Sequence, residues 1–301
     1  MVTRRASHAG SWYTDDTSAL RADLARWLQD AASASASAVP NASNLVALIV
    51  PHAGYSYSGP TAAFAYGAIR PEAVKRVIIL GPSHHVHTTK CMLTRAQTLD
   101  TPLGKLQCDA EFVAGLHAQH AGLFEYMDAE TDEDEHSIEM QLPYLAQVFG
   151  GVHTVKVVEI MVGSLSFEQE QQYGRVLAPY IADGSTLFVI SSDFCHWGRR
   201  FRYVRYEAEH GEIWQSIEKL DHEGIACIRS LDHAQFHAYL GKTKNTICGR
   251  HPIGVFLGAL EASAVHSRTR FELAQYAQSS RARAQSDSSV SYVAAHFITP
   301  E

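Results

Sequence analysis

The sequence predicts an α/β protein built on a largely parallel or mixed central sheet. Three short hydrophobic segments, at residues 45–50, 76–80 and 186–190, are rich in β-branched side chains and show no polar alternation. Such segments are typical of strands that are buried on both faces of a sheet. Amphipathic or apolar segments of helical length lie between them, and this alternation of strands and helices indicates the α/β class.

The first half of the chain adds helices, a turn and one irregular segment. Residues 18–29 carry leucines at helical spacing with charges between them, which predicts an amphipathic surface helix. The alanine- and serine-rich segment 31–44 is expected to be a flexible low-complexity loop. Small residues predict a helix near 61–69, a Thr-Pro-Leu-Gly sequence predicts a turn at 101–104, and helical spacing returns at 109–120.

The second half continues the alternation. A fourth strand is expected at 155–162 and a helix at 168–181. Helical spacing predicts another helix at 211–220, and residues 252–264 are apolar enough for a buried helix. Further strands are expected at 91–93, 271–277 and 290–297. No repeat and no linker interrupts the pattern, so residues 1–301 are expected to form a single domain.

Composition narrows the class of protein. The chain has 46% hydrophobic and 19% charged residues and a formal net charge of −7, without a basic block. This argues against sequence-independent binding of nucleic acid. No run approaches the ~20 apolar residues of a membrane span, so no membrane insertion is expected. The five cysteines include no CxxC pair, which favours reduced thiols in the cytoplasm or nucleus.

Each of the three leading strands runs into a histidine. His52, His84 and His196 follow the first, second and third strand, within the sequences PHAGY, GPSHH and SSDFCHWG. In open α/β sheets, ligands bind beyond the carboxyl ends of the strands. Parallel strands would therefore bring these imidazoles to one rim as metal ligands or catalytic groups, although each alone is compatible with a histidine bound to loop backbone. No HExxH motif or zinc-finger spacing occurs, so the metal prediction rests on geometry.

Two further groups are candidates for chemistry. Asp193 and His196 are three residues apart, so on a helical turn they would point the same way and the carboxylate would orient the imidazole as a base; the alternative is a helix N-cap. Cys248 precedes the 252–264 helix beside Arg250 and His251. These neighbours favour a thiolate, either nucleophile or soft metal ligand, whereas the alternative is an inert buried thiol.

Charged clusters have simpler interpretations. The acidic segment 131–140 suits a solvated helix N-terminus, although His136 could line the site. His85 is either a solvated neighbour of His84 or a group that supports it. Three arginines have two possible roles. They are either ordinary surface charges or contacts for an anion near the site: Arg199, Arg200 and Arg250.

Six ordered motifs together resemble the Memo family over about residues 6–292. They are HAGSWY at 8–13, PHAGY at 51–55, GPSHH at 81–85, DEDEHSIE at 132–139, SSDFCHWG at 191–198 and NTICGRHP at 245–252. The resemblance implies a three-layer α/β/α sandwich similar to the class III non-haem iron extradiol dioxygenases.

The resemblance also implies roles for particular residues. The resemblance assigns the metal-binding triad to His52, His84 and Cys248. It assigns catalytic roles in the pocket beside the metal to His196 and Asp193. The pocket would be lined by Trp12, Tyr55 and Tyr57. The dioxygenases use two histidines and a carboxylate, so a cysteine in third place favours copper(I), zinc or redox-linked iron over simple oxygen activation and makes ring cleavage a less favoured expectation.

The resemblance implies three possible functions. The cysteine among the expected metal ligands decides the order in which we consider them. The first is a copper- or iron-binding redox protein in cell signalling and motility. The second is a non-catalytic adaptor for phosphotyrosine-containing receptor peptides or signalling proteins in the same pocket. The third is an extradiol-type dioxygenase.

Overall fold

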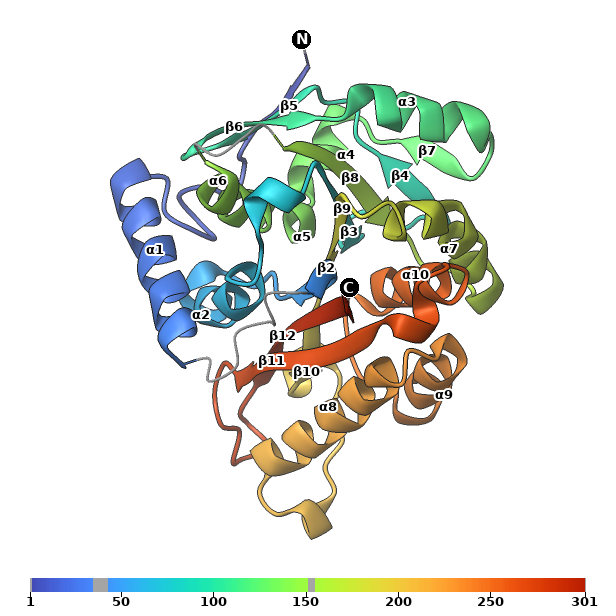
Figure 1. Cartoon of the computed structure of the whole chain (residues 1–301). Coiled ribbons are helices and arrows are strands. Elements are labelled where there is room, and N and C mark those ends of the chain that lie inside the picture. The colour runs from blue at the N-terminus through green and yellow to red at the C-terminus, as the bar shows by residue number, and fades with distance from the viewer. Residues whose placement is uncertain (1, 35–42, 151–154, 301) are drawn as a thin grey trace.

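The computed structural model describes residues 2–34, 43–150 and 155–300, and its centre is a mixed sheet (Figure 1). The four middle strands are β8 (Lys156–Val162), β3 (Arg76–Pro82), β9 (Thr186–Ser191) and β2 (Ser43–Val50). All four run parallel. The three predicted histidine-bearing strands are thus confirmed as β2, β3 and β9, with their carboxyl ends at one rim.

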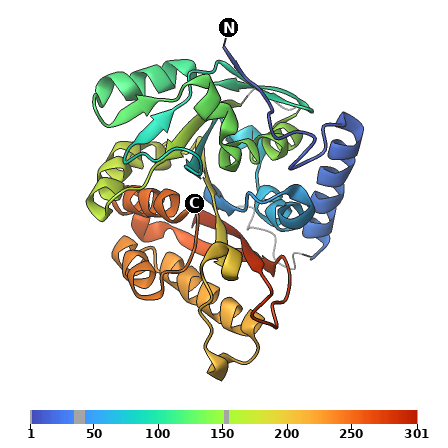
Figure 2. The same cartoon turned by 180° about the vertical axis from the view of Figure 1, so that it is seen from behind.

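Helices cover both faces of this sheet (Figures 1 and 2). On one face Val77 and Ile79 pack into a core shared with α1, α2 and α6; on the other, Ile78 and Leu80 pack toward α7 and α10. These helices are α1 (Thr17–Ala34), α2 (Tyr55–Tyr66), α6 (Leu142–Phe149), α7 (Phe167–Ile181) and α10 (Arg250–Glu261). The predicted α/β/α layering is confirmed, because alternate side chains of the parallel strands enter two separate apolar layers.

Antiparallel strands extend the sheet at both edges. On one side, the predicted turn at 101–104 closes a hairpin of β5 (Thr98–Thr101) and β6 (Gly104–Cys108). On the other, β12 (Ser289–Pro300) pairs with β2, β11 and β10. The other strands are β1 (Thr3–Arg4), β4 (Cys91–Leu93), β7 (Phe124–Tyr126), β10 (Asp193–Trp197) and β11 (Arg270–Gln278).

The remaining helical elements surround this frame. The α-helices are α3 (Ala110–Gln119), α4 (Ala129–Asp134), α5 (His136–Glu139), α8 (Ile213–Arg229) and α9 (His233–Thr243). The 3₁₀ turns are η1 (Pro71–Ala73), η2 (Arg199–Phe201), η3 (Ala208–His210) and η4 (His266–Arg268). None of the described helices combines the length and apolarity that a bilayer-spanning segment needs.

Several boundaries differ from the sequence prediction; the helix expected at 211–220, for example, continues to Arg229 as α8. Helix α1 continues to Ala34 and β2 already begins at Ser43, so residues 31–34 and 43–44 of the expected loop are helix and strand; residues 35–42 lie outside the described residues. Alanine is the best helix former, which accounts for the extension of α1. Helix α2 begins at Tyr55 rather than near 61, because Tyr55 is buried and its packing overrides the loop-like Ser-Gly-Pro sequence that follows it.

Candidate metal centre

Two imidazoles and a thiol converge at the carboxyl rim of the sheet. His52 follows β2, His84 follows β3, and Cys248 immediately precedes α10. One ligand atom from each of the three lies within 4.8 Å of the other two, and His52 Nε2 is 3.1 Å from Cys248 Sγ. Imidazole and thiolate are ligands for zinc, copper and iron. The predicted triad is therefore brought together in space.

The hydrogen bonds of Ser191 determine the orientation of His52. Ser191 Oγ donates to the Ser137 carbonyl oxygen at 2.7 Å and lies 2.7 Å from His52 Nδ1. Its single proton is used, so Ser191 must accept the bond from His52 Nδ1–H. The lone pair of His52 is consequently on Nε2, which faces Cys248. This is how a neighbouring group selects the tautomer of a metal-binding histidine.

Glu135 has the same role for His84. Its Oε1 is 2.8 Å from His84 Nδ1, and its Oε2 accepts the His84 backbone N–H at 2.6 Å. Burial would raise the pKa of Glu135, but the hydrogen bonds and charge of His84 and the charge of His136 outweigh it and lower that pKa to about 2. Glu135 is therefore a carboxylate that accepts the Nδ1 proton and leaves His84 Nε2 as the metal-facing atom.

Replacing Glu135 by glutamine should weaken metal binding without removing a ligand. The neutral amide accepts a weaker bond from His84, so the apparent affinity should fall about 10–100-fold. Competition with a chelator of known affinity measures the change. Glu133→Gln is the matched control, because Glu133 pairs with the exposed Arg5, and it should change the affinity less than about twofold. Equal losses in both variants would contradict the role of Glu135.

Cys248 is a neutral thiol in the protein alone. Burial raises the pKa of Cys248 well above its usual range, the Asp193 carboxyl raises it further, and backbone N–H groups only partly oppose these effects. The placement of Arg250 and His251 does not favour the thiolate predicted from them, because both side chains line another cavity, while Cys248 itself is partly exposed. Its nearest donor is the Asp193 backbone N–H, 3.2 Å away.

The imidazoles nearest the thiol are neutral too. Burial lowers the pKa of His52 well below the usual value, and the neighbouring imidazoles of His84 and His136 further disfavour a positive charge there. Burial, with the charge of His84, also lowers the pKa of His136 to about 3. Neutral imidazoles can act as metal ligands without first losing a proton.

Asp193 does not orient His196. Both lie on the strand β10, so the helical turn expected there is absent from this segment. Asp193 Oδ1 accepts the His52 backbone N–H at 2.9 Å, whereas His196 Nδ1 is held by the carbonyl oxygens of Phe194 and Thr246 at 2.9 and 3.1 Å. His196 still has its Nε2 lone pair free for a proton, but the group that selects this tautomer is backbone carbonyl rather than carboxylate.

Aromatic rings form one wall of the site. The His136 ring stacks on His84 with centroids 4.3 Å apart, and on Trp12 with centroids 4.2 Å apart. His85 lies 6.1 Å from His136, and the Tyr57 side chain is exposed. Tyr55 departs from the predicted pocket role, because it is buried in the core and its hydroxyl donates to the Met140 carbonyl at 2.7 Å.

Most of the acidic segment 131–140 is buried rather than solvated, with Asp134 as its exposed carboxylate, which corrects the sequence interpretation. Glu135 is 1% exposed and Glu139 is not exposed. Glu139 accepts from Arg4 Nη1 at 2.9 Å and from the Tyr13 hydroxyl at 2.8 Å. The carboxylates are compensated by the N-terminal segment, which lies about 130 residues away in sequence, so spacing within the acidic run could not indicate this.

The three arginines predicted as anion contacts do not lie together in the structure. Arg199 and Arg200 are exposed on η2, and the Arg200 guanidinium lies 4.4 Å over the Phe201 ring, which in turn contacts His196 edge-on. Arg250 lines a different cavity, between α7, α9 and α10.

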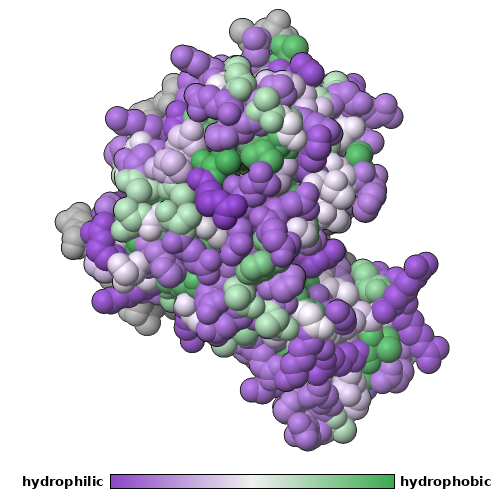
Figure 3. Space-filling view, turned by 90° about the vertical axis from the view of Figure 1, so that its right-hand side faces the viewer, coloured by the Kyte–Doolittle hydropathy of each residue, from purple (hydrophilic) through white to green (hydrophobic). Residues whose placement is uncertain are grey.

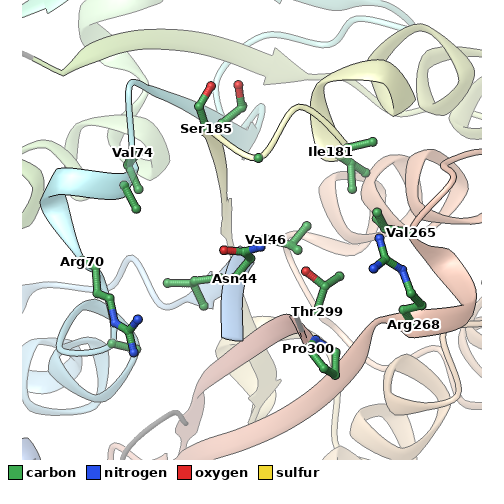
Figure 4. Close-up of a pocket in the computed structure, with 16 residues that line it drawn as sticks. Asn44, Val46, Arg70, Val74, Ile181, Ser185, Val265, Arg268, Thr299 and Pro300 are labelled. Carbon is green, nitrogen blue, oxygen red and sulfur yellow. The ribbon is translucent and has the colours of Figure 1, made fainter. Parts of the chain in front are cut away.

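Another cavity, of about 170 Å³, lies at the opposite rim, by the amino ends of β2 and β9. Figure 4 shows Arg70 and Arg268 on its two sides. Its described lining contains no histidine, cysteine or carboxylate, so it offers no ligand set of the kind found at the other rim.

Comparison with known proteins places this chain in a family. Residues 4–296 match the family described as Memo-like protein. Protein MEMO1 of Danio rerio is 49% identical over 300 residues, covering 99% of this chain and 98% of that protein. Protein MEMO1 of Homo sapiens is 47% identical over 296 residues, covering 98% and 97%. The Protein memo-1 homolog of Caenorhabditis elegans is 44% identical over 293 residues, covering 96% and 81%.

A solved structure is also similar. The uncharacterized protein JW3007 from Escherichia coli K12 matches with a TM-score of 0.48 and 15% identity, covering 81% of this chain and 98% of that one. The match along nearly the whole sequence is what assigns the chain, and the chain belongs to the Memo family.

Proposed function

We propose that the protein binds copper or iron in a redox role within cell signalling and motility. The observation that supports this most is the convergence of His52, His84 and Cys248, whose ligand atoms lie within 4.8 Å of one another. Ser191 and Glu135 hold the Nδ1 atoms of the two imidazoles, so both rings present Nε2. The same donor set would also accept zinc.

The residues around the triad divide the remaining tasks. Bound copper or iron would supply one-electron redox chemistry. His196 Nε2 would accept or return a proton, because its Nδ1 proton is committed to backbone carbonyls. The stacked rings of Trp12 and His136 would restrict water on one side. Metal content and superoxide or peroxide production by the purified protein test this function. We expect superoxide or peroxide production to depend on bound metal. If the metal-loaded protein alters the level of neither superoxide nor peroxide, the redox role is refuted.

Metal binding should release about one proton per site at pH 8. The Cys248 thiol is protonated at this pH because its pKa is raised, whereas imidazoles, with an ordinary pKa of about 6.5, are already neutral. The apparent affinity should therefore fall about tenfold as the pH drops from 8 to 7, since the metal must compete with one more proton. A weakly buffered titration with a pH indicator measures the release.

The control for this prediction is Cys248→Ser, whose hydroxyl does not ionise in this range. It should release far less than one proton per metal bound. Equal proton release by the wild type and this variant would show that Cys248 is not a ligand.

A second candidate is an adaptor that binds phosphotyrosine peptides. It is favoured by Trp12, which is 37% exposed beside His136, and by the exposed Arg199 and Arg200 near His196. An aromatic ring and guanidinium groups suit a phosphorylated phenol. Titration with matched phosphorylated and unphosphorylated peptides tests this candidate, and equal affinities would exclude it. The free cysteines fit a reducing cytoplasmic or nuclear setting for either function.

A further inference from the structure

A further cavity, of about 430 Å³, lies between α7, α9 and the start of α10 and is lined by both apolar and charged side chains. The segment 245–251 borders both this cavity and the metal centre. Cys248 Sγ contacts His52, whereas Arg250 and His251 line the cavity. The cavity volume falls in the range of small-molecule sites.

Two permanent cations line this cavity without a carboxylate partner. Among the described residues, neither Lys244 nor Arg250 forms an ion pair, and the only side-chain bond of Arg250 is to the Ile247 carbonyl at 3.5 Å. Lys244 lies at the end of α9 with a φ of 54°, a left-handed conformation that glycine or asparagine adopts more easily. Both charges are thus available to a ligand.

The one carboxylate in the cavity lining does not neutralise these cations. Glu170 Oε2 is 2.6 Å from His233 Nε2, and Glu170 Oε1 is 2.6 Å from His251 Nδ1. Both oxygens are therefore engaged by imidazole N–H groups, and the bond from Nδ1–H fixes the His251 ring with its lone pair on Nε2. Gly254 makes this possible, because a Cβ there would lie 2.3 Å from Glu170 Oε2.

Backbone and hydroxyl groups add to the positive character. Arg250 and His251 form the first turn of the 12-residue helix α10, whose N-terminus carries partial positive charge, although the Arg250 N–H already donates to the Ile247 carbonyl. Thr246 and His237 also line the cavity and supply polar atoms. The face of the molecule seen in Figure 3 is mostly hydrophilic, with apolar residues in small separate patches, which suits a charged ligand better than an apolar partner.

We propose that this cavity binds the phosphate group of a small phosphorylated metabolite. Lys244 would supply a point charge and Arg250 a planar fork of N–H donors, a combination that matches a phosphate dianion with several acceptor oxygens. The cavity has room for an organic group beyond the phosphate. This inference does not depend on the metal centre.

Calorimetric titration of the full chain at constant ionic strength tests the proposal, with inorganic phosphate, phenyl phosphate and acetate as probes. We expect saturable binding of phosphate at one site and tighter binding of phenyl phosphate. Acetate should bind at least tenfold more weakly than phosphate. The variant Lys244→Asn/Arg250→Gln should weaken phosphate binding at least tenfold, since asparagine tolerates the left-handed position.

The control Lys219→Gln/Arg281→Gln removes the same charges from exposed positions outside the cavity and should change phosphate affinity less than twofold. If the double cavity variant does not fold, Lys244→Asn alone should still weaken binding at least threefold. Equal affinity in the wild type and a folded cavity variant, equal loss in the control, or acetate binding as tight as phosphate would each overturn the proposal. Metal content measured on the same wild-type sample keeps this outcome separate from that of the metal centre.

Discussion

A His52→Ala/Cys248→Ser variant is expected to purify without stoichiometric copper or iron. The double variant removes two of the three atoms that converge at the rim. Removing a group that only supports a ligand costs metal affinity about 10–100-fold, so losing two ligands should cost more than 100-fold. Elemental analysis after reconstitution and dialysis measures the effect.

The matched control takes the same residue types from α8. His222→Ala/Cys227→Ser removes an imidazole packed against Tyr276 and a partly buried thiol, both away from the rim. This control should retain the metal content of the wild type. Equal metal content in the site variant and the control would refute the triad.

Gly174→Ala is expected to destabilise the fold severely. Gly174 lies in α7 where this helix crosses α10, and a Cβ there would be 2.5 Å from the Gly258 carbonyl carbon and 2.6 Å from the Ala259 nitrogen. These are backbone atoms, so relief requires the helices to move apart. Overpacking of this kind costs about 3 kcal/mol of unfolding free energy. Chemical denaturation followed by circular dichroism measures the loss.

Gly241→Ala is the control for helix glycines in general. Gly241 lies in α9, and no atom lies within 4 Å of the position that a Cβ would occupy. Alanine there should raise the unfolding free energy by about 0.5–1 kcal/mol, because it lowers the entropy of the unfolded chain. If both variants changed stability in the same direction, the close crossing of α7 and α10 would be contradicted.

The sequence predicts the middle of the sheet well because burial on both faces leaves a local signature. The apolar runs of β2, β3 and β9 are visible without any tertiary information. The edges are less predictable. The chain after β9 continues as β10 only because β12 pairs with it, and such long-range pairing leaves little mark on residues 193–197.

The candidate site, like the sheet, has a part that the sequence predicts and a part that it does not. His52 and His84 are indicated by their place after buried strands, and a rim of parallel strands brings them together. The roles of Glu135 and Ser191 are not visible in the sequence, because each depends on a contact across many residues, such as the bond between Glu135 and His84. The position of Ser191 as the last residue of β9 is the one feature that could indicate its role from sequence.

The pKa of Cys248 cannot be predicted from the charged residues that neighbour it in sequence. Arg250 and His251 are neighbours of Cys248 in sequence, yet both side chains line the other cavity. Desolvation and the nearby Asp193 carboxyl raise the pKa of Cys248, although this residue is only partly buried. Sequence proximity measures separation along the chain, whereas a pKa depends on distance and burial in the folded protein.

The claim that His52, His84 and Cys248 hold a metal is tested most directly by a crystal structure of metal-loaded protein, with anomalous data at the iron, copper and zinc edges. We expect one anomalous peak about 2.0–2.1 Å from Nε2 of each histidine and about 2.3 Å from Cys248 Sγ. A peak held instead by His84, Glu135 and His136, or no peak near Cys248 in fully loaded protein, would contradict the account.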